Sequence, residues 1–216
     1  MKDETSIEVD LFLKSMETRK SIYTFLSAVY FNEVSLNFLE RLRNQPVVLE
    51  GFLDVFVRSL KDADLEQIRT DLAAEYARVF LGMSRFPVSP YESVYTSDLH
   101  ILMQDARDKV LKEYRTEGLA IKEGFNLPED HISFEMDFMG YLCQKTIDSI
   151  KDGRKDDERN LLLRQRVFFF DHIQSWVPEF CVDVGKKVHT MFYQGVVQLT
   201  EAFVDSERGF LSRYSN

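Results

Sequence analysis

The sequence predicts an all-α protein: a single compact bundle of about seven to nine helices, with a long loop rich in proline and aromatic residues. Two observations predict this fold. The 216 residues include only nine Gly and five Pro, which are fewer turn-forming residues than a β-rich chain needs. Apolar residues recur mostly at spacings of three, four and seven, the pattern of a helix with one buried face.

The helical segments follow one another along the chain. We expect them over residues 22–30, 65–80, 97–114 and 134–142, with a last long helix over 180–199. Each segment keeps its apolar residues on one face, so each is expected to pack against the others.

Polar caps and prolines predict where helices begin. Ser97 before an aspartate suits a helix cap, and Pro128, followed by two acidic residues, suits a first helical turn. Pro178 repeats that pattern, so we expect a break between Trp176 and Pro178. The polar run 151–155 reads as a connector between two helices.

Composition and charge exclude several classes of protein. A hydrophobic content of 44% excludes a disordered chain, and 27 Lys+Arg against 36 Asp+Glu argues against a nucleic-acid partner. The first ten residues lack a secretory signal pattern, and no apolar run approaches the roughly 20 residues of a membrane span. We therefore expect a cytoplasmic protein with one domain over residues 1–216 and a hinge near 124–127.

The residues that usually carry catalysis or bind metals form no known motif. The four histidines and two cysteines lack the spacings of a zinc site, and no phosphate-binding glycine loop or nucleophile elbow occurs. Cys143 and Cys181 lie in apolar helical stretches and are expected to be buried thiols. The sequence therefore predicts no catalytic residue, no metal and no cofactor.

One segment, Gly82–Tyr95 (GMSRFPVSPYESVY), departs from the helical pattern. Pro87 and Pro90 exclude a continuous helix, and Phe86, Tyr91 and Tyr95 make the segment aromatic. Long irregular loops in compact domains are often functional. Two interpretations remain: an aromatic connector packed on the bundle, or part of a binding site.

A second segment, 126–131 (NLPEDH), reads as a junction between a loop and a helix. Asp130 and His131 are expected in the first helical turn, where the helix dipole favours a carboxylate and a neutral imidazole. Ordinary helix capping and a recognition site at the helix end are both compatible with this pattern.

At these segments the sequence resembles the TorD/DmsD family of redox-enzyme maturation chaperones. Residues 75–82 resemble the family's E-Y-x-x-L-F-x-G helix end, and 87–95 its P-x-x-P-[WY]-E-S-V-Y loop. Residues 127–142 resemble its P-D-H…E-L-x-F-x-x-L element, and 170–180 its H-L-x-x-W…F segment. The chain departs from the pattern at Tyr91, where some members have Trp, and at Glu129, which lengthens P-D-H to P-E-D-H. The first 60 residues match no family motif.

The resemblance implies a chaperone without catalysis, which binds the twin-arginine signal peptide and catalytic subunit of a molybdenum-cofactor oxidoreductase. The chaperone would hold that subunit for cofactor insertion before export, with at most transient membrane contact through the export machinery. A peptide that is cationic at its arginine pair and apolar beyond it requires carboxylates beside an aromatic groove. The expected peptide-binding residues are Phe86, Tyr91, Glu92, Ser93, Tyr95, Leu127, Glu129, Asp130 and His131.

Within this set the carboxylates of Glu92, Glu129 and Asp130 are expected to meet the guanidinium groups. The expected supporting residues are Glu75, Tyr76, Pro87, Pro90, Pro128 and Glu135. Glu75 is expected to accept hydrogen bonds from backbone donors of the 82–95 loop, and Glu135 to support His131.

Two other functions remain open at this point. One is a nucleotide-binding, GTP-type switch or hydrolase on the same bundle, which the missing phosphate loop disfavours. The other is a helical scaffold whose loop is only structural. The client enzyme and the subfamily are open, and so is the choice between a monomer and a domain-swapped homodimer.

Overall fold

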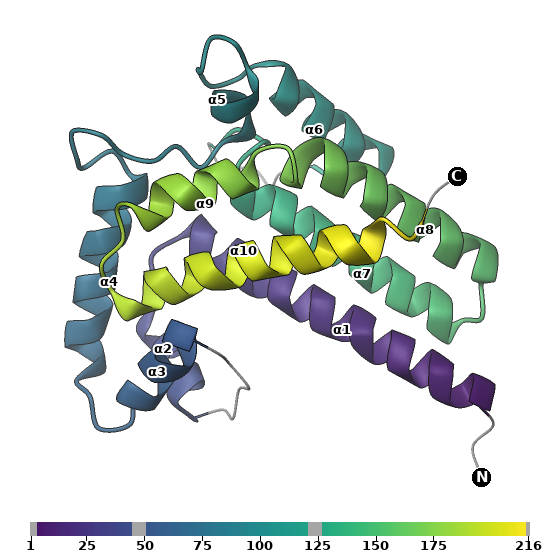
Figure 1. The fold of residues 1–216 in the computed structure, drawn as a ribbon, viewed down its shortest axis with the longest axis horizontal. Coiled ribbons are helices and arrows are strands. Elements are labelled where there is room, and N and C mark those ends of the chain that lie inside the picture. The colour runs from purple at the N-terminus through teal and green to yellow at the C-terminus, as the bar shows by residue number, and fades with distance from the viewer. Residues whose placement is uncertain (1–3, 45–50, 121–126, 215–216) are drawn as a thin grey trace.

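The structure, a computed structural model, describes residues 4–44, 51–120 and 127–214 and is an all-helical bundle (Figure 1). Its helices are α1 (Glu4–Phe31), α2 (Leu36–Asn44), α3 (Gly51–Ser59), α4 (Leu65–Phe80), α5 (Glu92–Thr96), α6 (Asp105–Thr116), α7 (Ile132–Lys151), α8 (Lys155–Phe168), the π-helical turn η1 (Phe169–Ile173), α9 (Val177–Gly185) and α10 (Met191–Leu211). The all-α prediction is confirmed. Within the described ranges there are ten α-helices, and α5 is a short helix of five residues.

Four helices build the centre of the bundle. α1 runs along α7, α8 continues beside α7, and α10 packs on α3 and α9 (Figure 1). Aromatic side chains fill much of the space between these helices. The Tyr30 ring meets Phe80 and Phe180 edge-on, at centroid distances of 6.1 and 5.4 Å. The amphipathic spacing of the sequence therefore corresponds to one large core, with a second, smaller cluster around Met16, Ile147 and Leu162.

A buried ion pair joins the middle of α1 to α10. The Arg19 guanidinium donates to both carboxylate oxygens of Glu207, at 2.6 and 2.5 Å, and the Tyr23 hydroxyl donates to the same carboxylate at 2.7 Å. Both charged side chains are almost completely buried. Removing either partner would leave a buried charge unpaired, which is costly in a low-dielectric interior.

Two of the predicted helix starts are wrong. Ser97 follows α5 as its C-cap, and α6 begins only at Asp105, because His100 and Met103 between them have φ angles of 51° and 60° that interrupt a helix. Pro128 precedes the next helix instead of opening it. α7 begins at Ile132 with His131 as its N-cap, so Asp130 lies before the helix.

The last predicted helix is in fact two helices. α9 ends at Gly185, and α10 begins at Met191, where the Thr190 hydroxyl accepts from the Tyr193 amide. The expected break at Trp176 is confirmed, with a proline in the first turn of α9. Just before that break, η1 contains a hydrogen bond from the Gln174 amide to the Phe169 carbonyl, which the apolar spacing did not indicate.

Two further features concern the chain as a whole. Most of the predicted hinge near 124–127 lies outside the described residues, which resume at Leu127. Among the helices that the structure describes, none combines the length and the apolar character needed to cross a membrane.

We predict opposite effects for two glycine substitutions in α10. In Gly195→Ala the new Cβ would lie 2.6 Å from the Leu53 amide nitrogen in α3, so we expect a loss of about 1–3 kcal/mol in unfolding free energy. In Gly209→Ala nothing lies within 4 Å, so we expect a gain of roughly 0.5–1 kcal/mol from helix propensity. Urea unfolding measures both values, and a stabilised Gly195→Ala variant would contradict the close contact of α3 and α10.

Candidate functional site

The two irregular segments singled out by the sequence meet in the structure. Tyr91 and His131 form an antiparallel β-bridge. The Ile132 amide donates to the Pro90 carbonyl at 2.9 Å, and the Glu92 amide donates to the Asp130 carbonyl at 3.0 Å. The proline-aromatic loop is therefore fixed by main-chain hydrogen bonds to the start of α7.

A buried carboxylate fixes the start of α5. Asp130 is fully buried, and its Oδ2 accepts from the Ser93 amide at 2.9 Å. Ser93 is also fully buried, and its Oγ accepts at 3.1 Å from the amide of Gln104, the N-cap residue of α6. Asp130 and Ser93 together connect the segment before α7, α5 and the start of α6.

A second pair of buried carboxylates joins α5 to η1 and α7 to the start of α9. Glu92 Oε2 lies 2.9 Å from His172 Nδ1, and Trp176 Nε1 donates to Glu135 Oε2 at 3.0 Å. Burial, with the nearby Glu92 carboxylate as the next cause, raises the pKa of Glu135 well above its usual value. The Glu135 side chain therefore bonds to Trp176, and its link to His131 is through the main chain, where the Glu135 amide donates to the His131 carbonyl at 3.2 Å.

His131 lies in an aromatic environment at the start of α7. Its Nδ1 accepts from the Ser133 amide at 3.1 Å, and its ring lies 5.0 Å from the Tyr91 ring and 5.9 Å from that of Phe134. Burial lowers the pKa of His131 to about 4. The neutral imidazole expected from the sequence is confirmed, with burial as its cause.

Glu75 and Tyr76 support other parts of the bundle. Glu75 accepts from the His189 amide at 2.6 Å and from the Thr190 amide at 3.1 Å, so it holds the turn between α9 and α10. The expected hydrogen bonds from Glu75 to the proline-aromatic loop are therefore wrong. The Tyr76 hydroxyl donates to the Tyr30 carbonyl at 2.9 Å, which ties α4 to α1.

An open groove lies between the proline-aromatic loop and α9. It has a volume of about 480 Å³ and is here called the loop–α9 groove. Its lining comes from the loop, α5, the segment after α5, α9 and the turn that follows: Phe86, Pro87, Val88, Ser89, Val94, Tyr95, His100, Glu179, Asp183, Lys186 and Lys187. Of the expected binding residues, only Phe86 and Tyr95 line it, with Pro87 from the expected supporting set.

The two aromatic residues of the groove differ in exposure. Phe86 is 64% exposed, and the cationic groups of Arg85 and Lys187 lie 5.2 and 5.9 Å from its ring centroid. Tyr95 packs its ring 5.3 Å from Trp176. Burial raises the pKa of Tyr95, and the carboxylates of Asp183 and Glu179 raise it further. The groove thus presents one exposed and one anchored aromatic side chain.

The acidic part of the groove comes from α9. Glu179 and Asp183 are one helical turn apart, so they lie on the same side of α9. Asp183 forms an ion pair of 3.0 Å with Lys186, whereas Glu179 has no ion-pair partner among the described residues. In the sequence, Glu179 after Pro178 indicates a helix start, and its spacing of four from Asp183 also indicates a shared acidic face.

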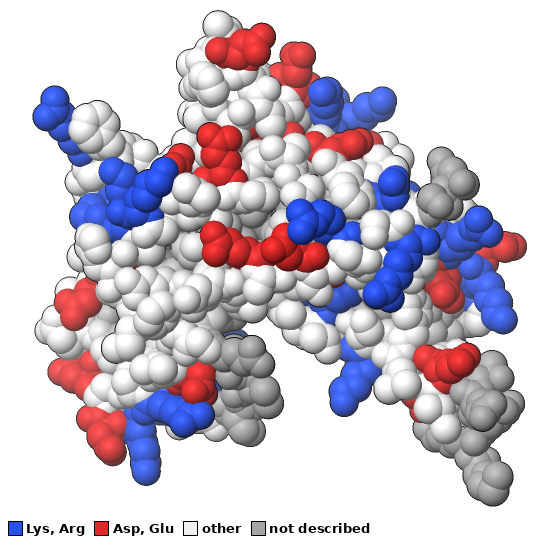
Figure 2. Space-filling view, in the orientation of Figure 1, with Lys and Arg blue, Asp and Glu red and all other residues white. Residues whose placement is uncertain are grey.

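The carboxylates expected to meet a cationic peptide lie elsewhere. Glu92 and Asp130 are 3% and 0% exposed, and Glu129 forms an ion pair with Arg107 at 2.5 Å. On the face shown in Figure 2, acidic and basic side chains are interspersed. Glu92 and Asp130 therefore contribute no surface charge to a groove, and the Glu129 charge is already paired.

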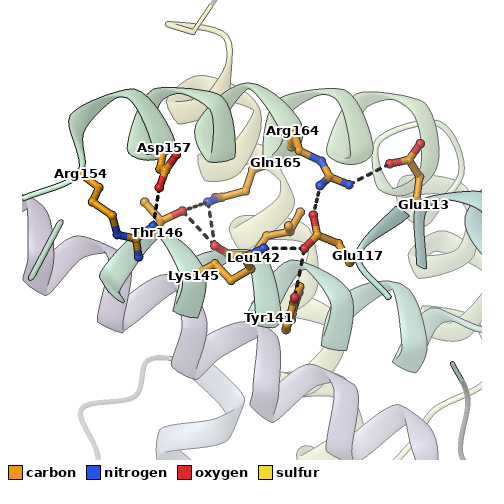
Figure 3. A network of polar contacts seen from close by, with 10 residues as sticks. All are labelled: Glu113, Glu117, Tyr141, Leu142, Lys145, Thr146, Arg154, Asp157, Arg164 and Gln165. Atoms are coloured by element: carbon orange, nitrogen blue, oxygen red, sulfur yellow. Dashed lines mark hydrogen bonds and ion pairs between the residues drawn. The ribbon is translucent and has the colours of Figure 1, made fainter. Parts of the chain in front are cut away.

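A second hollow, of about 350 Å³, lies between α7 and α8 and is strongly polar (Figure 3). The buried Glu117 carboxylate accepts from Lys145 at 2.7 Å and from the Tyr141 hydroxyl at 3.0 Å, and it also pairs with Arg164. Arg154, the other cation of this hollow, pairs with Asp157. The three cations are thus already neutralised, so this network fastens the end of α6 to α7 and α8.

Possible metal ligands and the two cysteine thiols were the remaining candidates for chemistry in the described residues. In the part of the chain that the structure describes, no group of three or more His, Cys, Asp and Glu residues is arranged to hold a metal ion. Cys143 and Cys181 are buried as expected, and burial raises the pKa of Cys143 to about 12 and that of Cys181 further. Both thiols are therefore protonated near neutral pH.

Comparisons with known proteins agree on one family. The family model described as nitrate reductase delta subunit matches residues 49–182. A chaperone protein TorD from Photobacterium profundum is 27% identical over 220 residues, which cover 93% of this chain and 97% of the relative. A chaperone protein TorD from Vibrio parahaemolyticus is 26% identical over 210 residues, covering 90% and 95%.

Among solved structures, the chain is similar to a proposed redox enzyme maturation protein from Archaeoglobus fulgidus. The TM-score is 0.46 with 18% sequence identity, and the match covers 88% of this chain and 93% of the other.

We predict that His131 makes the protein less stable in acid. The unfolded chain takes up a proton at this residue below about pH 6.5, whereas the folded chain keeps it neutral until about pH 4. The unfolding free energy should therefore fall by about 3 kcal/mol as the pH drops through this range. His131→Asn, which retains a capping side chain, should reduce that loss in urea titrations. An unchanged acid slope would contradict the burial of a neutral imidazole.

Glu135 should have the opposite dependence on pH. Its pKa is raised in the folded state, so above the ordinary value near 4.5 the unfolded chain loses this proton first, and stability falls as the pH rises. Glu135→Gln, which still accepts from Trp176, should remove this fall. Glu201→Gln, at an exposed position of α10, is the control and should leave the slope unchanged. Equal slopes in all three proteins would exclude a buried protonated carboxyl at Glu135.

Proposed function

The chain belongs to the nitrate reductase delta subunit family, the family of the TorD chaperones, and from this premise we propose that it binds the twin-arginine signal peptide of a molybdoenzyme catalytic subunit. It would hold the apo subunit in the cytoplasm during molybdenum-cofactor insertion and delay export until that subunit is folded. Its role is binding, without catalysis of its own.

The observation that supports this proposal best is the loop–α9 groove. A twin-arginine peptide combines two guanidinium groups with an apolar run, and the groove combines the Glu179 and Asp183 carboxylates with Phe86 and Tyr95. Glu179 is exposed and has no ion-pair partner in the described ranges, so a guanidinium can approach it without breaking an existing contact. At Asp183 an arginine would replace Lys186.

The buried residues of the family motifs have an indirect role in this proposal. Asp130, Ser93, Glu92 and His131 fix α5, and α5 presents Val94 and Tyr95 to the groove. Because these four side chains are buried, they position the binding surface and do not contact the peptide when it first binds the groove.

Three expected binding residues are partly exposed near the start of α7. Tyr91, Leu127 and Glu129 are at intermediate exposure there, and none of them lines the groove. In our proposal they extend the contact to other parts of the precursor.

The acidic net charge supports the encounter with a cationic peptide. A charge of −9 attracts such a partner over distances of the order of the Debye length, mainly through the association rate. No observation favours the GTP-type switch, because the cations of the polar hollow between α7 and α8 are already paired.

Peptide titrations test the groove directly. We expect Glu179→Gln/Asp183→Asn to weaken binding of a labelled twin-arginine leader peptide by about 10-fold or more, because two charge-assisted hydrogen bonds are lost. Fluorescence anisotropy at low and physiological salt measures the affinity.

The matched control for this titration is Glu201→Gln/Asp205→Asn. These residues are also one turn apart, exposed and on a helix, and Asp205 pairs with Arg208 as Asp183 does with Lys186. Equal affinities of the groove variant and this control would refute the proposed use of the groove. A complete absence of peptide binding would favour the scaffold interpretation.

A further inference from the structure

An exposed apolar loop follows α5. Residues 97–104, here called the apolar loop, connect α5 to α6. Four of its side chains are large, apolar and about half or more exposed: Leu99 at 68%, Ile101 at 51%, Leu102 at 44% and Met103 at 60%. Soluble domains rarely gather so many exposed apolar side chains in one short segment unless it contacts a partner.

The backbone holds these side chains outward in a strained conformation. His100 and Met103 have φ angles of 51° and 60°, a region that residues with a side chain seldom adopt. His100 Nδ1 lies 2.9 Å from the Val94 carbonyl, and Gln104 Nε2 donates to the Leu102 carbonyl at 2.9 Å. Strain of this kind persists only where surrounding contacts enforce it, and it often marks a binding segment.

We propose that the apolar loop docks the apolar segment that follows the arginine pair in the signal peptide. This inference rests on the proposed function. His100 belongs to the apolar loop and also lines the loop–α9 groove, so the two surfaces are continuous. A peptide whose arginines lie at Glu179 and Asp183 thus has this loop at the edge of its site.

The size of the peptide's apolar segment supports this arrangement. Such segments contain about 7–15 residues, which as a helix extend over roughly 10–23 Å. The groove itself offers few apolar side chains beyond Phe86, Val94 and Tyr95, and four polar or charged residues of α9 and its following turn complete that side. A segment of this length needs further apolar surface, and the apolar loop provides it.

Two other occupants fit less well. A stable dimer interface buries about 800 Å² on each partner, and four side chains on one loop provide a much smaller area. An anionic membrane would be repelled by Asp98, Asp105 and Asp108, which outnumber Lys109 beside the loop, while Arg107 nearby is already paired with Glu129. A short apolar polypeptide segment that carries positive charge is therefore the occupant we propose.

The test uses two synthetic peptides and the full chain. The long peptide contains the arginine pair and 12 following Leu and Ala residues, about the middle of the usual range, and the short peptide ends after the arginine pair. Leu99→Ser/Met103→Ser removes two exposed side chains of the apolar loop. Leu11→Ser is the control, because Leu11 is 63% exposed on α1, outside the groove and the loop.

We expect the loop variant to bind the long peptide about 10-fold or more weakly than wild type, and the short peptide equally well. Leu11→Ser should bind both peptides as wild type does. Thermal unfolding of the loop variant should match that of wild type, since the replaced side chains are exposed. Unchanged affinity for the long peptide, or equal losses for both peptides, would overturn the proposal.

Further outcomes separate this inference from the proposed function. If Glu179→Gln/Asp183→Asn weakens both peptides while the loop variant weakens neither, only the role of the apolar loop fails. If wild type binds neither peptide, both proposals fail. If the loop variant instead loses co-sedimentation with phosphatidylglycerol vesicles, or loses a dimer in size-exclusion chromatography, the loop serves a membrane or a second copy and the proposal is wrong.

Discussion

The hydrogen bond from the Ser93 amide to the buried Asp130 carboxylate, with the Glu92–His172 contact beside it, is the interaction on which the candidate site depends. α5 has only five residues, too few for a helix to be stable on its own. It persists because the buried side chains of Asp130 and His172 and the main-chain amide of Gln104, from three other segments, hold its first turn. The proline-aromatic loop ends at α5 and residues 97–104 begin after it, so these contacts help to position both segments.

This arrangement separates the residues that shape the site from those exposed to a partner. The acidic residues of the family motifs, Glu92, Asp130 and Glu135, lie in the interior, where an unpaired charge is costly. In the proposed function, contact with a cationic partner falls to Glu179 and Asp183 on α9. Glu179 lies within the motif-like residues 170–180, but the motif does not specify an acidic residue there. The acidic residues of the family motifs therefore position the groove from the interior and do not form the surface that a peptide would touch.

The sequence predicted the fold well, because the spacing of apolar residues reflects burial directly. It also singled out the segments around Pro90 and Asp130, but their contact is a tertiary pairing that local patterns do not encode. Pro128 was misread as a helix start because prolines suit both first turns and preceding loops. Ser97 was misread because the positive φ angles at His100 and Met103 fall on residue types that seldom adopt them. The acid pair on α9 was visible in the spacing of Glu179 and Asp183, but only the structure shows that it borders a groove.

The π-helical turn at Phe169–Ile173 has a consequence for helical phase. Its hydrogen bond from Gln174 to Phe169 spans five residues where an α-helix spans four, so it accommodates one extra residue between the end of α8 and the break at Trp176. Each residue turns an α-helix by about 100°. Without the extra residue, His172 would leave the side of the helix that faces Glu92. The buried contact that holds α5 therefore depends on the number of residues in a turn far along the chain. Deletion of Phe169, which lies just before the motif-like residues 170–180, would turn His172 away from Glu92 and leave those residues in place.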